Sequence, residues 1–254
     1  MSLDSVRAGS SDFPPRLPSG RLGVAVVSEL VELIVTGELQ EGELLPAEGP
    51  LSEHFGVSRT VLRESIKRLE EKGLVIVAQG RGTQVARLGT WNILDPVVLS
   101  ALIDNDQSLG ILDELTVVRS SLESSMAGVV ATRRTDDELV RIEHALTAMR
   151  ETEHDSDAFR QADYLFHITL MELSQNRLAE NIAKSLYRRA LDSARYQGMG
   201  HEGAFCLTLE EHSRVVQAIA ARDVPSAEKA MRDHIEVAWE RRRFPTRRTG
   251  SRKG

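Results

Sequence analysis

Residues 51–64 read LSEHFGVSRTVLRE, and this stretch decides the fold of the first third of the chain. Gly56 suits the end of a short helix, because glycine readily adopts the left-handed conformation that closes a helix. Ser58 is a good N-cap, since its hydroxyl can accept a hydrogen bond from a free backbone N–H group. The stretch therefore predicts a helix, a tight turn and a second helix that runs from Arg59 to about Lys72.

The second of these helices has a basic face opposite a buried one. Its apolar residues recur at spacings of four and three, which is typical of a core-facing stripe: Leu62, Ile66 and Leu69. Arg59 and Arg63 line up on another face, and arginine suits bidentate contact with guanine in the major groove. We expect Lys67, one turn further, to meet phosphate. The alternative is that these are ordinary solvated charges.

The segments around this pair of helices complete a small DNA-binding architecture. Residues 22–36 have the pattern of an amphipathic first helix. Two β-prone runs, 75–77 and 84–86, flank Gly80-Arg81-Gly82, and glycine supplies the positive φ that a tight hairpin turn needs. The sequence therefore predicts a winged helix-turn-helix domain over residues 21–88, with Gly80 and Arg81 at the tip of the wing.

The distribution of charge along the sequence agrees with a DNA-binding domain, although the net charge of the protein does not. The net charge is −6, whereas proteins that bind nucleic acid usually carry a basic face. Residues 58–87 hold seven Lys and Arg against three Glu, a local charge of +4. The basic charge is therefore concentrated where DNA would be contacted.

Several motifs of this region resemble the DNA-binding domain of the GntR family of bacterial regulators: Leu44-Leu45-Pro46-Ala47-Glu48, the stretch 51–64, Gly73-Leu74 and Gly80-Arg81-Gly82. The resemblance covers residues 22–87 and implies a set of operator contacts, made by Ser58, Arg59, Thr60, Arg63 and, in the minor groove, Gly80. The chain departs from the family at Gly49-Pro50, where an arginine usually stands. A phosphate or base contact made from that position is therefore missing.

The rest of the chain is predicted to be helical between two disordered ends. Residues 1–20 and the basic tail 241–254 are too polar and too interrupted by Pro and Gly to pack. After a linker over 89–96, residues 97–240 contain amphipathic stretches that predict an all-α bundle of six to seven helices. The expected fold class is thus mainly α, with a winged helix-turn-helix followed by this bundle.

Four polar residues of the second domain stand where helical periodicity calls for apolar ones: Asp163, His167, His212 and His234. Burying them without partners would cost about 1–3 kcal/mol for each unsatisfied polar group, and more for the charge. A shared divalent cation removes that cost, and Asp163 and His167, at i and i+4, project from one face. A single histidine on such a stripe is more often a hydrogen-bonded core residue, but four together favour a metal site.

The pattern of Asp163, Phe166, His167, His212 and His234 also resembles the metal-binding pattern of the FCD-type effector domain found in one GntR subgroup, over residues 95–240. The single cysteine, Cys206, excludes a thiolate cluster, so the ligands are nitrogen and oxygen. Such ligands suit Zn, Mn, Ni or Fe. Zinc is the metal that the resemblance favours.

We also expect an effector site beside the metal. Arg119 lies on an apolar stripe, and a buried guanidinium needs an anion such as a carboxylate. The resemblance places an arginine of this helix in the effector pocket and adds Asn176, and Arg195 is a further candidate. The alternative for Arg119 is a surface ion pair with Glu123.

The segment 91–99, WNILDPVVL, resembles the junction of GntR regulators that respond to sugar acids such as galactonate. The alternative is a packed linker anchored by Trp91. A hydroxy-carboxylate would suit the site, because its carboxylate and neighbouring hydroxyl could complete the metal shell while Arg119 holds the charge.

The sequence therefore predicts a ligand-responsive transcriptional regulator and not an enzyme. We expect a homodimer that binds a palindromic operator, because two-fold proteins select two-fold DNA. Repression relieved by a small carboxylate is the expected behaviour; the alternatives are a sensor of the metal itself and a metal-dependent enzyme. The chain has no apolar run of about 18 residues and no secretory leader, so we expect a cytoplasmic protein without a membrane partner.

Overall fold

The computed structural model describes residues 19–78, 80–193 and 204–243. The chain divides between Asn92 and Ile93 into two compact units, and each is described by itself. Among the described residues, no helix combines the length and the apolar character that crossing a membrane requires.

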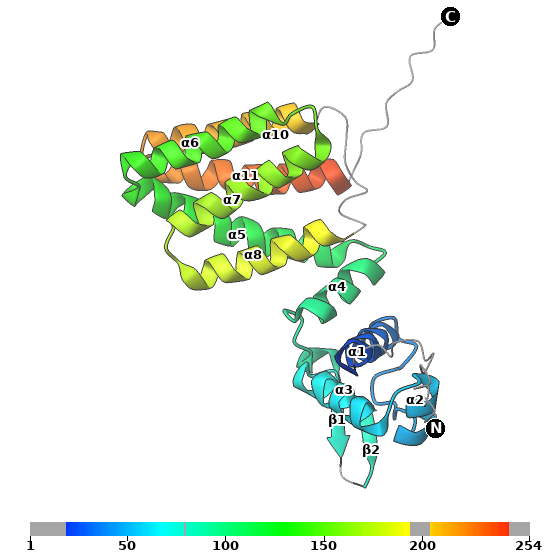
Figure 1. Ribbon diagram of the computed structural model, residues 1–254. Coiled ribbons are helices and arrows are strands. Elements are labelled where there is room, and N and C mark those ends of the chain that lie inside the picture. The colour runs from blue at the N-terminus through cyan, green and yellow to red at the C-terminus, as the bar shows by residue number, and fades with distance from the viewer. Residues whose placement is uncertain (1–18, 79, 194–203, 244–254) are drawn as a thin grey trace, which may run out of the picture. The chain divides into compact units, whose positions relative to one another are not determined.

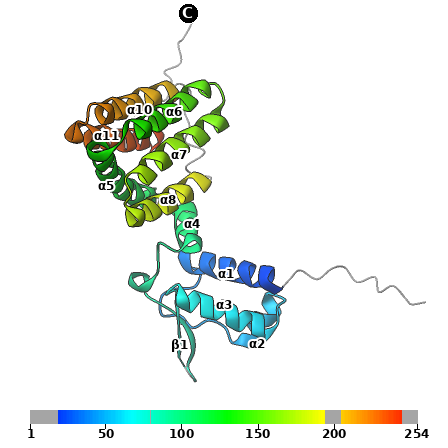
Figure 2. The same ribbon diagram turned by 60° about the vertical axis from the view of Figure 1, so that its left-hand side comes forward.

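The first unit is a three-helix domain with a β-hairpin (Figure 1). Its elements are α1 (Ser19–Val35), α2 (Glu48–His54), α3 (Arg59–Glu71), β1 (Val75–Ala78), β2 (Gly82–Val85) and a short 3₁₀ helix (Leu88–Thr90). The hairpin projects from the helices in every view (Figures 1 and 2). This arrangement confirms the predicted winged helix-turn-helix.

The turn between α2 and α3 forms as the sequence predicts. Gly56 has a φ of 61°, and the Ser58 hydroxyl accepts a hydrogen bond from the Val61 N–H at 3.3 Å. Leu62 and Leu69 are fully buried. The stripe they form fixes the rotation of α3, so its basic face points away from the core.

The end of α3 is tightly packed at Gly73. This residue has a φ of 73°, and a Cβ placed there would lie 2.0 Å from the Thr90 carbonyl oxygen. The Thr90 hydroxyl donates a hydrogen bond back to the Gly73 carbonyl at 2.9 Å. Glycine is therefore required both for the conformation and for the space.

The wing consists of two antiparallel strands, with Val75 opposite Val85 in register. A third segment extends it: the Leu45 N–H donates to the Thr83 carbonyl at 2.8 Å, and the Val85 N–H donates to the Glu43 carbonyl at 2.8 Å. The chain before α2 is thus fastened to β2, which anchors the base of the wing.

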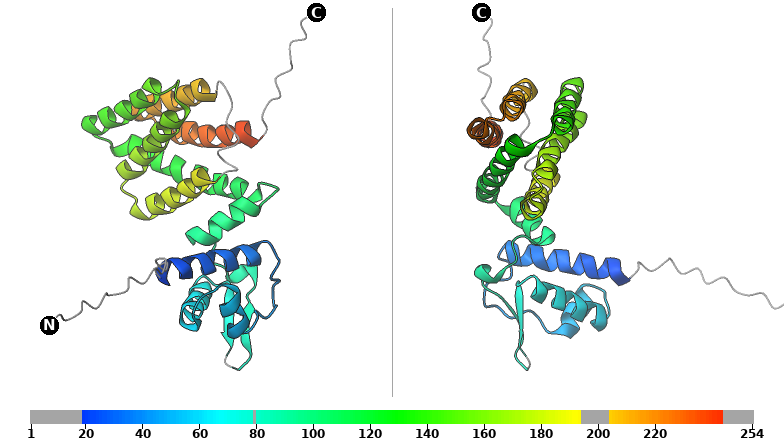
Figure 3. Two further views of the ribbon diagram at one scale, coloured as in Figure 1. Left: turned by 45° about the vertical axis from the view of Figure 1, so that its right-hand side comes forward. Right: turned by 90° about the vertical axis from the view of Figure 1, so that its left-hand side faces the viewer.

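The second unit is a helical bundle, as Figure 3 shows from two sides. Its described helices are α4 (Pro96–Asn105), α5 (Gly110–Arg133), α6 (Asp136–Glu151), α7 (Ser156–Leu173), α8 (Arg177–Asp192), α10 (Ala204–Ala220) and α11 (Val224–Arg243). Helix α5 packs against α7, α8, α10 and α11 and is buried along much of its length. The expected fold class, mainly α with an all-α second domain, is confirmed.

Helices α5 and α11 pack closely at Gly128. A Cβ added at Gly128 would lie 2.4 Å from a side-chain oxygen of Glu228. The main apolar core lies around it and draws on α5, α6, α7, α10 and α11; it includes Val130, Ile142, Phe166, Val215 and Met231. This packing brings the inner faces of α7, α10 and α11 together.

Three predicted boundaries are wrong by a few residues. Helix α4 already begins at Pro96, inside the expected linker, because the Asp95 carboxylate accepts the free N–H of Val97 at 2.9 Å. Helix α1 begins at Ser19, and α11 continues to Arg243. The remainder of both predicted tails lies outside the described residues.

Candidate metal centre

Asp163, His167, His212 and His234 meet inside the second unit. One ligand atom from each lies within 4.8 Å of all the others, and all four residues are buried. Nε2 of His167 is 3.2 Å from Nε2 of His234 and 3.3 Å from Nε2 of His212, while Oδ1 of Asp163 is 3.3 Å from Nε2 of His212. Three helices, α7, α10 and α11, therefore direct one oxygen and three nitrogen atoms at a common point.

Each histidine is held at its other ring nitrogen by an acceptor. Nδ1 of His167 lies 2.6 Å from Oε2 of Glu123, and Nδ1 of His234 lies 3.0 Å from Oε2 of Glu211. Nδ1 of His212 lies 2.8 Å from the backbone carbonyl of Thr208. A proton on Nδ1 satisfies each of these contacts and leaves the Nε2 lone pair free.

Asp163 tests whether a cation fits. Its Oδ2 accepts a hydrogen bond from the Tyr187 hydroxyl at 2.8 Å. Its Oδ1 is buried and is the one described side-chain oxygen or nitrogen of this kind without a hydrogen-bond partner. This oxygen faces imidazole nitrogens that also present lone pairs, so a positive ion at the common point would satisfy all four atoms.

The electrostatics of the site favour the ligand forms of these side chains. Burial lowers the pKa of His212 well below 6.5, and burial also lowers the pKa of His234 despite its bond to Glu211. Burial alone would raise the pKa of the Asp163 carboxyl, but the three histidines outweigh it and lower that pKa. Near neutral pH the centre therefore offers the Asp163 carboxylate and the neutral imidazoles of His212 and His234, which are the forms that bind metal.

Arg119 is buried and forms an ion pair with Glu123, with Nε 2.7 Å from Oε1. Its guanidinium carbon also lies 3.5 Å from the centre of the Tyr187 ring. Arg119 and His167 together lower the pKa of the Glu123 carboxyl to about 2, against the opposing effect of burial. The ion pair between Arg119 and Glu123, which was the alternative expectation, is therefore present. It lies in the interior and not at the surface.

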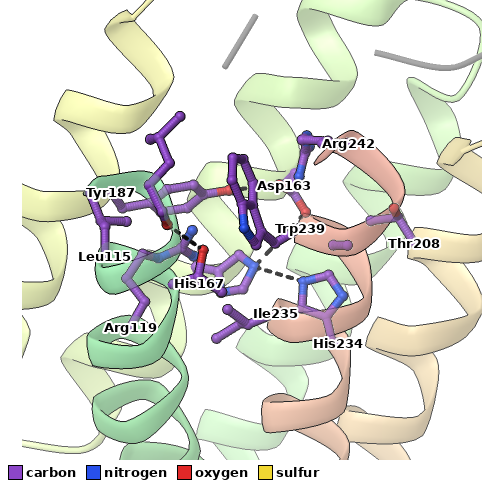
Figure 4. Close-up of a pocket in the computed structure, with 13 residues that line it drawn as sticks. Leu115, Arg119, Asp163, His167, Tyr187, Thr208, His234, Ile235, Trp239 and Arg242 are labelled. Carbon is purple, nitrogen blue, oxygen red and sulfur yellow. Dashed lines mark hydrogen bonds and ion pairs between the residues drawn. The ribbon is translucent and has the colours of Figure 1, made fainter. Parts of the chain in front are cut away.

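A small cavity of about 20 Å³ is lined by three of the four residues, Asp163, His167 and His234. Figure 4 shows Arg119, Asp163, His167 and His234 around it, with a dashed line between the two histidine rings. Its other polar lining residues include Thr208, Trp239 and Arg242. A volume of this size holds about one water-sized group.

One expected effector residue, Asn176, is not among the residues that line this cavity. Asn176 is exposed and caps helix α8, where its side-chain oxygen accepts the Ala179 N–H at 3.2 Å. The capping hydrogen bond accounts for the side chain locally, and its role in effector binding stays a prediction. Arg195 lies outside the described residues.

The predicted DNA-reading residues are exposed in the first unit. Arg59, Thr60, Arg63 and Lys67 are exposed along α3, and Ser58, Gly80 and Arg81 are exposed at the helix cap and at the wing tip. Arg63 is held by Glu48, with Nε 2.9 Å from Oε2 and 3.0 Å from Oε1. The contacts of these residues with DNA remain a prediction.

Sequence reasoning missed the groups that support the ligands. Glu123, Glu211 and Tyr187 each contact a ligand side chain, and the sequence pattern assigns none of them that role. Glu123 could have been found, because it falls one turn from Arg119 on a largely buried helix. Glu211 precedes His212 directly, and nothing in its spacing distinguishes it from the exposed Glu210.

Comparisons with known proteins agree across both units. Residues 22–85 match the family model described as bacterial regulatory proteins, gntR family, and residues 114–237 match the FCD domain. The galactonate operon transcriptional repressor of Escherichia coli (strain K12) is 34% identical over 207 residues, which are 81% of this chain and 90% of that protein. The transcriptional regulator LutR of Bacillus subtilis (strain 168) is 31% identical over 207 residues, covering 80% and 93%.

Among the solved structures with a similar fold is one from Listeria monocytogenes. It is that of Lar, described as controlling expression of the Listeria monocytogenes agr system, with a TM-score of 0.57 and 19% identity over 87% of this chain and 96% of that one. At this identity the likeness concerns the fold alone.

Proposed function

Because the chain belongs to the GntR family of bacterial regulatory proteins and carries an FCD domain, we propose that it is a repressor whose operator affinity a small carboxylate alters from a metal-containing site. Members of this family are DNA-binding transcriptional regulators and not enzymes. The proposal therefore concerns the ligand, the metal and the sign of the response.

One observation carries the proposal: Oδ1 of Asp163 and the Nε2 atoms of three histidines converge, and Arg119 lines the same cavity. Oxygen and nitrogen ligands suit zinc, and also Mn, Ni or Fe. A bound divalent cation would offer a coordination position to an oxygen of the effector. The guanidinium of Arg119 would then attract the carboxylate charge from the side.

The chemical class of the effector follows from these two charges. A carboxylate with a neighbouring hydroxyl can contact a cation through two oxygens while it keeps its charge near Arg119. The relative named as a galactonate operon repressor supports a sugar acid, as does the resemblance of segment 91–99. The cavity of about 20 Å³ admits the carboxylate end of such a ligand only if its lining side chains, which include Trp239 and Arg242, move apart.

For DNA, we propose a homodimer on a palindromic operator. One DNA-binding domain would cover half of a site, and α3 would bring Arg59 and Arg63 to base edges and Lys67 to phosphate. All three side chains are exposed, as such contacts require. The acidic helical unit would supply the dimer contact. The effector then changes operator affinity only by preferring one arrangement of the two DNA-binding domains.

The experiment uses full-length metal-loaded protein and an operator selected from random duplex DNA. Fluorescence anisotropy would follow release of the labelled operator during titration with sugar acids. We expect weaker DNA binding with one of these acids, no such response in Arg119→Gln, and a normal response in Arg133→Gln, an exposed arginine of the same helix. Operator affinity that is indifferent to every small carboxylate would overturn the proposal.

A further inference from the structure

Two of the three histidines in the centre each end a series of contacts that runs from an arginine through a glutamate to the histidine. Arg119 holds Glu123, which holds His167, and Arg241 holds Glu211, which holds His234. Arg119 and His167 of the first series line the cavity described above. The second series begins at Arg241, in the last turn of α11.

The second series has close contacts at every step. Glu211 Oε2 lies 3.0 Å from Nδ1 of His234 and 2.9 Å from Nη2 of Arg241, and Nη1 of Arg241 contacts Oε1 of the same carboxylate. Two parallel contacts between a guanidinium and a carboxylate fix its plane as well as its charge. Glu211 therefore has one orientation in which it can accept the proton of His234.

Arg241 also reaches the support of a second ligand. Its Nη2 lies 3.4 Å from the hydroxyl of Thr208, and the backbone carbonyl of Thr208 is the acceptor for Nδ1 of His212. The backbone at Thr208 and the side chain of Glu211 both belong to α10, one turn apart. A single arginine on α11 thus contacts the two residues that orient His212 and His234.

The burial of Glu211 shows why it needs its ion pair with Arg241. The Glu211 side chain is 11% exposed, so its carboxylate needs charged partners, whereas Arg241 is 21% exposed and keeps one side toward solvent. Neighbouring Glu210 and Arg214 form a looser pair, 3.9 Å apart, with side chains 67% and 65% exposed. The exposed pair of Glu210 and Arg214 on α10 is therefore a matched control for the buried Glu211.

We propose that Glu211 and Arg241 are positioning residues of the metal centre, which orient His234 and His212 so that the final turn of α11 sets the affinity for the ion. The proposal rests on the metal site proposed above. Groups that orient metal-bound histidines are typically worth 10–100-fold in metal affinity.

The test measures the affinity of full-length variants for Zn²⁺ by competition with a chromophoric chelator. We expect Glu211→Gln to weaken Zn²⁺ binding by about 10–100-fold and Arg241→Ala by about tenfold. Arg241→Lys, which keeps the charge but loses the two-pronged contact, should fall between Arg241→Ala and the parent protein. Glu210→Gln and Arg214→Ala should bind as the parent protein does.

A second measurement separates positioning from general stability. Thermal unfolding in a chelator reports the metal-free fold, and the rise of the midpoint on adding Zn²⁺ reports binding. The proposal predicts that the rise shrinks in Glu211→Gln and Arg241→Ala while the control variants keep it. Arg241→Lys and Arg241→Ala alter a partly exposed side chain, so they decide the question even if Glu211→Gln fails to fold.

Zn²⁺ affinities within twofold of the parent protein in both Arg241 variants would overturn the inference and leave the metal site itself intact. An equal loss of affinity in the control variants would overturn it as well. A parent protein that binds no metal would instead overturn the proposed function.

Discussion

Nδ1 of His167, on α7, lies 2.6 Å from Oε2 of Glu123, on α5, and the other oxygen of that carboxylate holds Arg119. One buried carboxylate thus joins a metal ligand to the arginine of the proposed effector site. A substitution at Glu123 therefore affects both His167 and Arg119, because a buried charge that loses its partner destabilises the fold.

Glu123→Gln should therefore destabilise the fold as well as the centre. Removing one member of a buried ion pair costs about 3–5 kcal/mol, because the other charge stays buried without compensation. Urea unfolding in a chelator measures this loss. Glu114→Gln, an exposed residue of the same helix, should change the free energy of unfolding by less than about 0.5 kcal/mol. A Glu123 variant as stable as its control would contradict the buried pair.

Asp163→Asn should abolish metal binding without weakening the metal-free fold. In the absence of an ion, Oδ1 of Asp163 is buried without a hydrogen-bond partner, 3.3 Å from Nε2 of His212. An asparagine can place an amide N–H there and donate it to the imidazole. Thermal unfolding with and without chelator, together with elemental analysis, checks both parts. A large fall of the metal-free midpoint would show that the carboxylate is structural.

Metal-free protein should lose stability as the pH falls from 7 to 5. Burial keeps the pKa of His212 and His234 below 6.5, so below that pH the unfolded chain binds protons that the folded chain does not. The free energy of unfolding then falls by at most about 1.4 kcal/mol per pH unit for each histidine, and above pH 7 it is insensitive to them.

Urea unfolding at several pH values in a chelator measures the slope. His212→Gln should flatten it, whereas His154→Gln, whose side chain is 93% exposed, should not. An equal slope in both variants would count against the buried neutral imidazoles.

Arg59→Ala should cost about 1–3 kcal/mol of discrimination between operator and unrelated DNA and leave folding intact. The side chain is exposed at the first turn of α3, so little packing is lost. Competition binding with specific and non-specific duplexes measures the discrimination. Arg68→Ala, also exposed on α3, is the control for a general loss of positive charge. Unfolding of the Arg59 variant would refute the assignment of the helix face.

Gly73→Ala and Gly80→Ala should differ sharply although both glycines have a φ near 75°. A Cβ at Gly73 would lie 2.0 Å from the Thr90 carbonyl oxygen, whereas a Cβ at Gly80 meets nothing within 4 Å. Strain alone costs about 1–2 kcal/mol, so Gly80→Ala should remain folded. Gly73→Ala should lose clearly more stability in chemical unfolding. Similar losses at the two positions would show that the backbone at Gly73 relaxes easily.

The parts of the fold that the sequence predicts well are governed by local rules. The cap at Ser58, the turn at Gly56 and the stripe of Leu62 and Leu69 each depend on neighbours within a few residues. Helix ends were less predictable. Helix α11 passes its expected end because Arg241 is held by α10, and such a long-range contact leaves no local signal.

The same distinction holds within the metal centre. Asp163 and the three histidines could be identified because each interrupts an apolar stripe, and the structure places them together. Their supporting groups could not, since the role of Glu211 exists only through partners on α11. Asn176, by contrast, follows a local rule: it lies at a helix start, where its side chain caps the helix.

The order of the ligands along the chain has a consequence for biosynthesis. Asp163 and His167 leave the ribosome long before His212, and His234 follows last, on a helix that packs against α5. A nascent chain that stops short of residue 234 lacks one imidazole and the C-terminal half of α11. The four-ligand site is therefore complete only when the final helix docks, so a product truncated before residue 234 would lack the complete metal site.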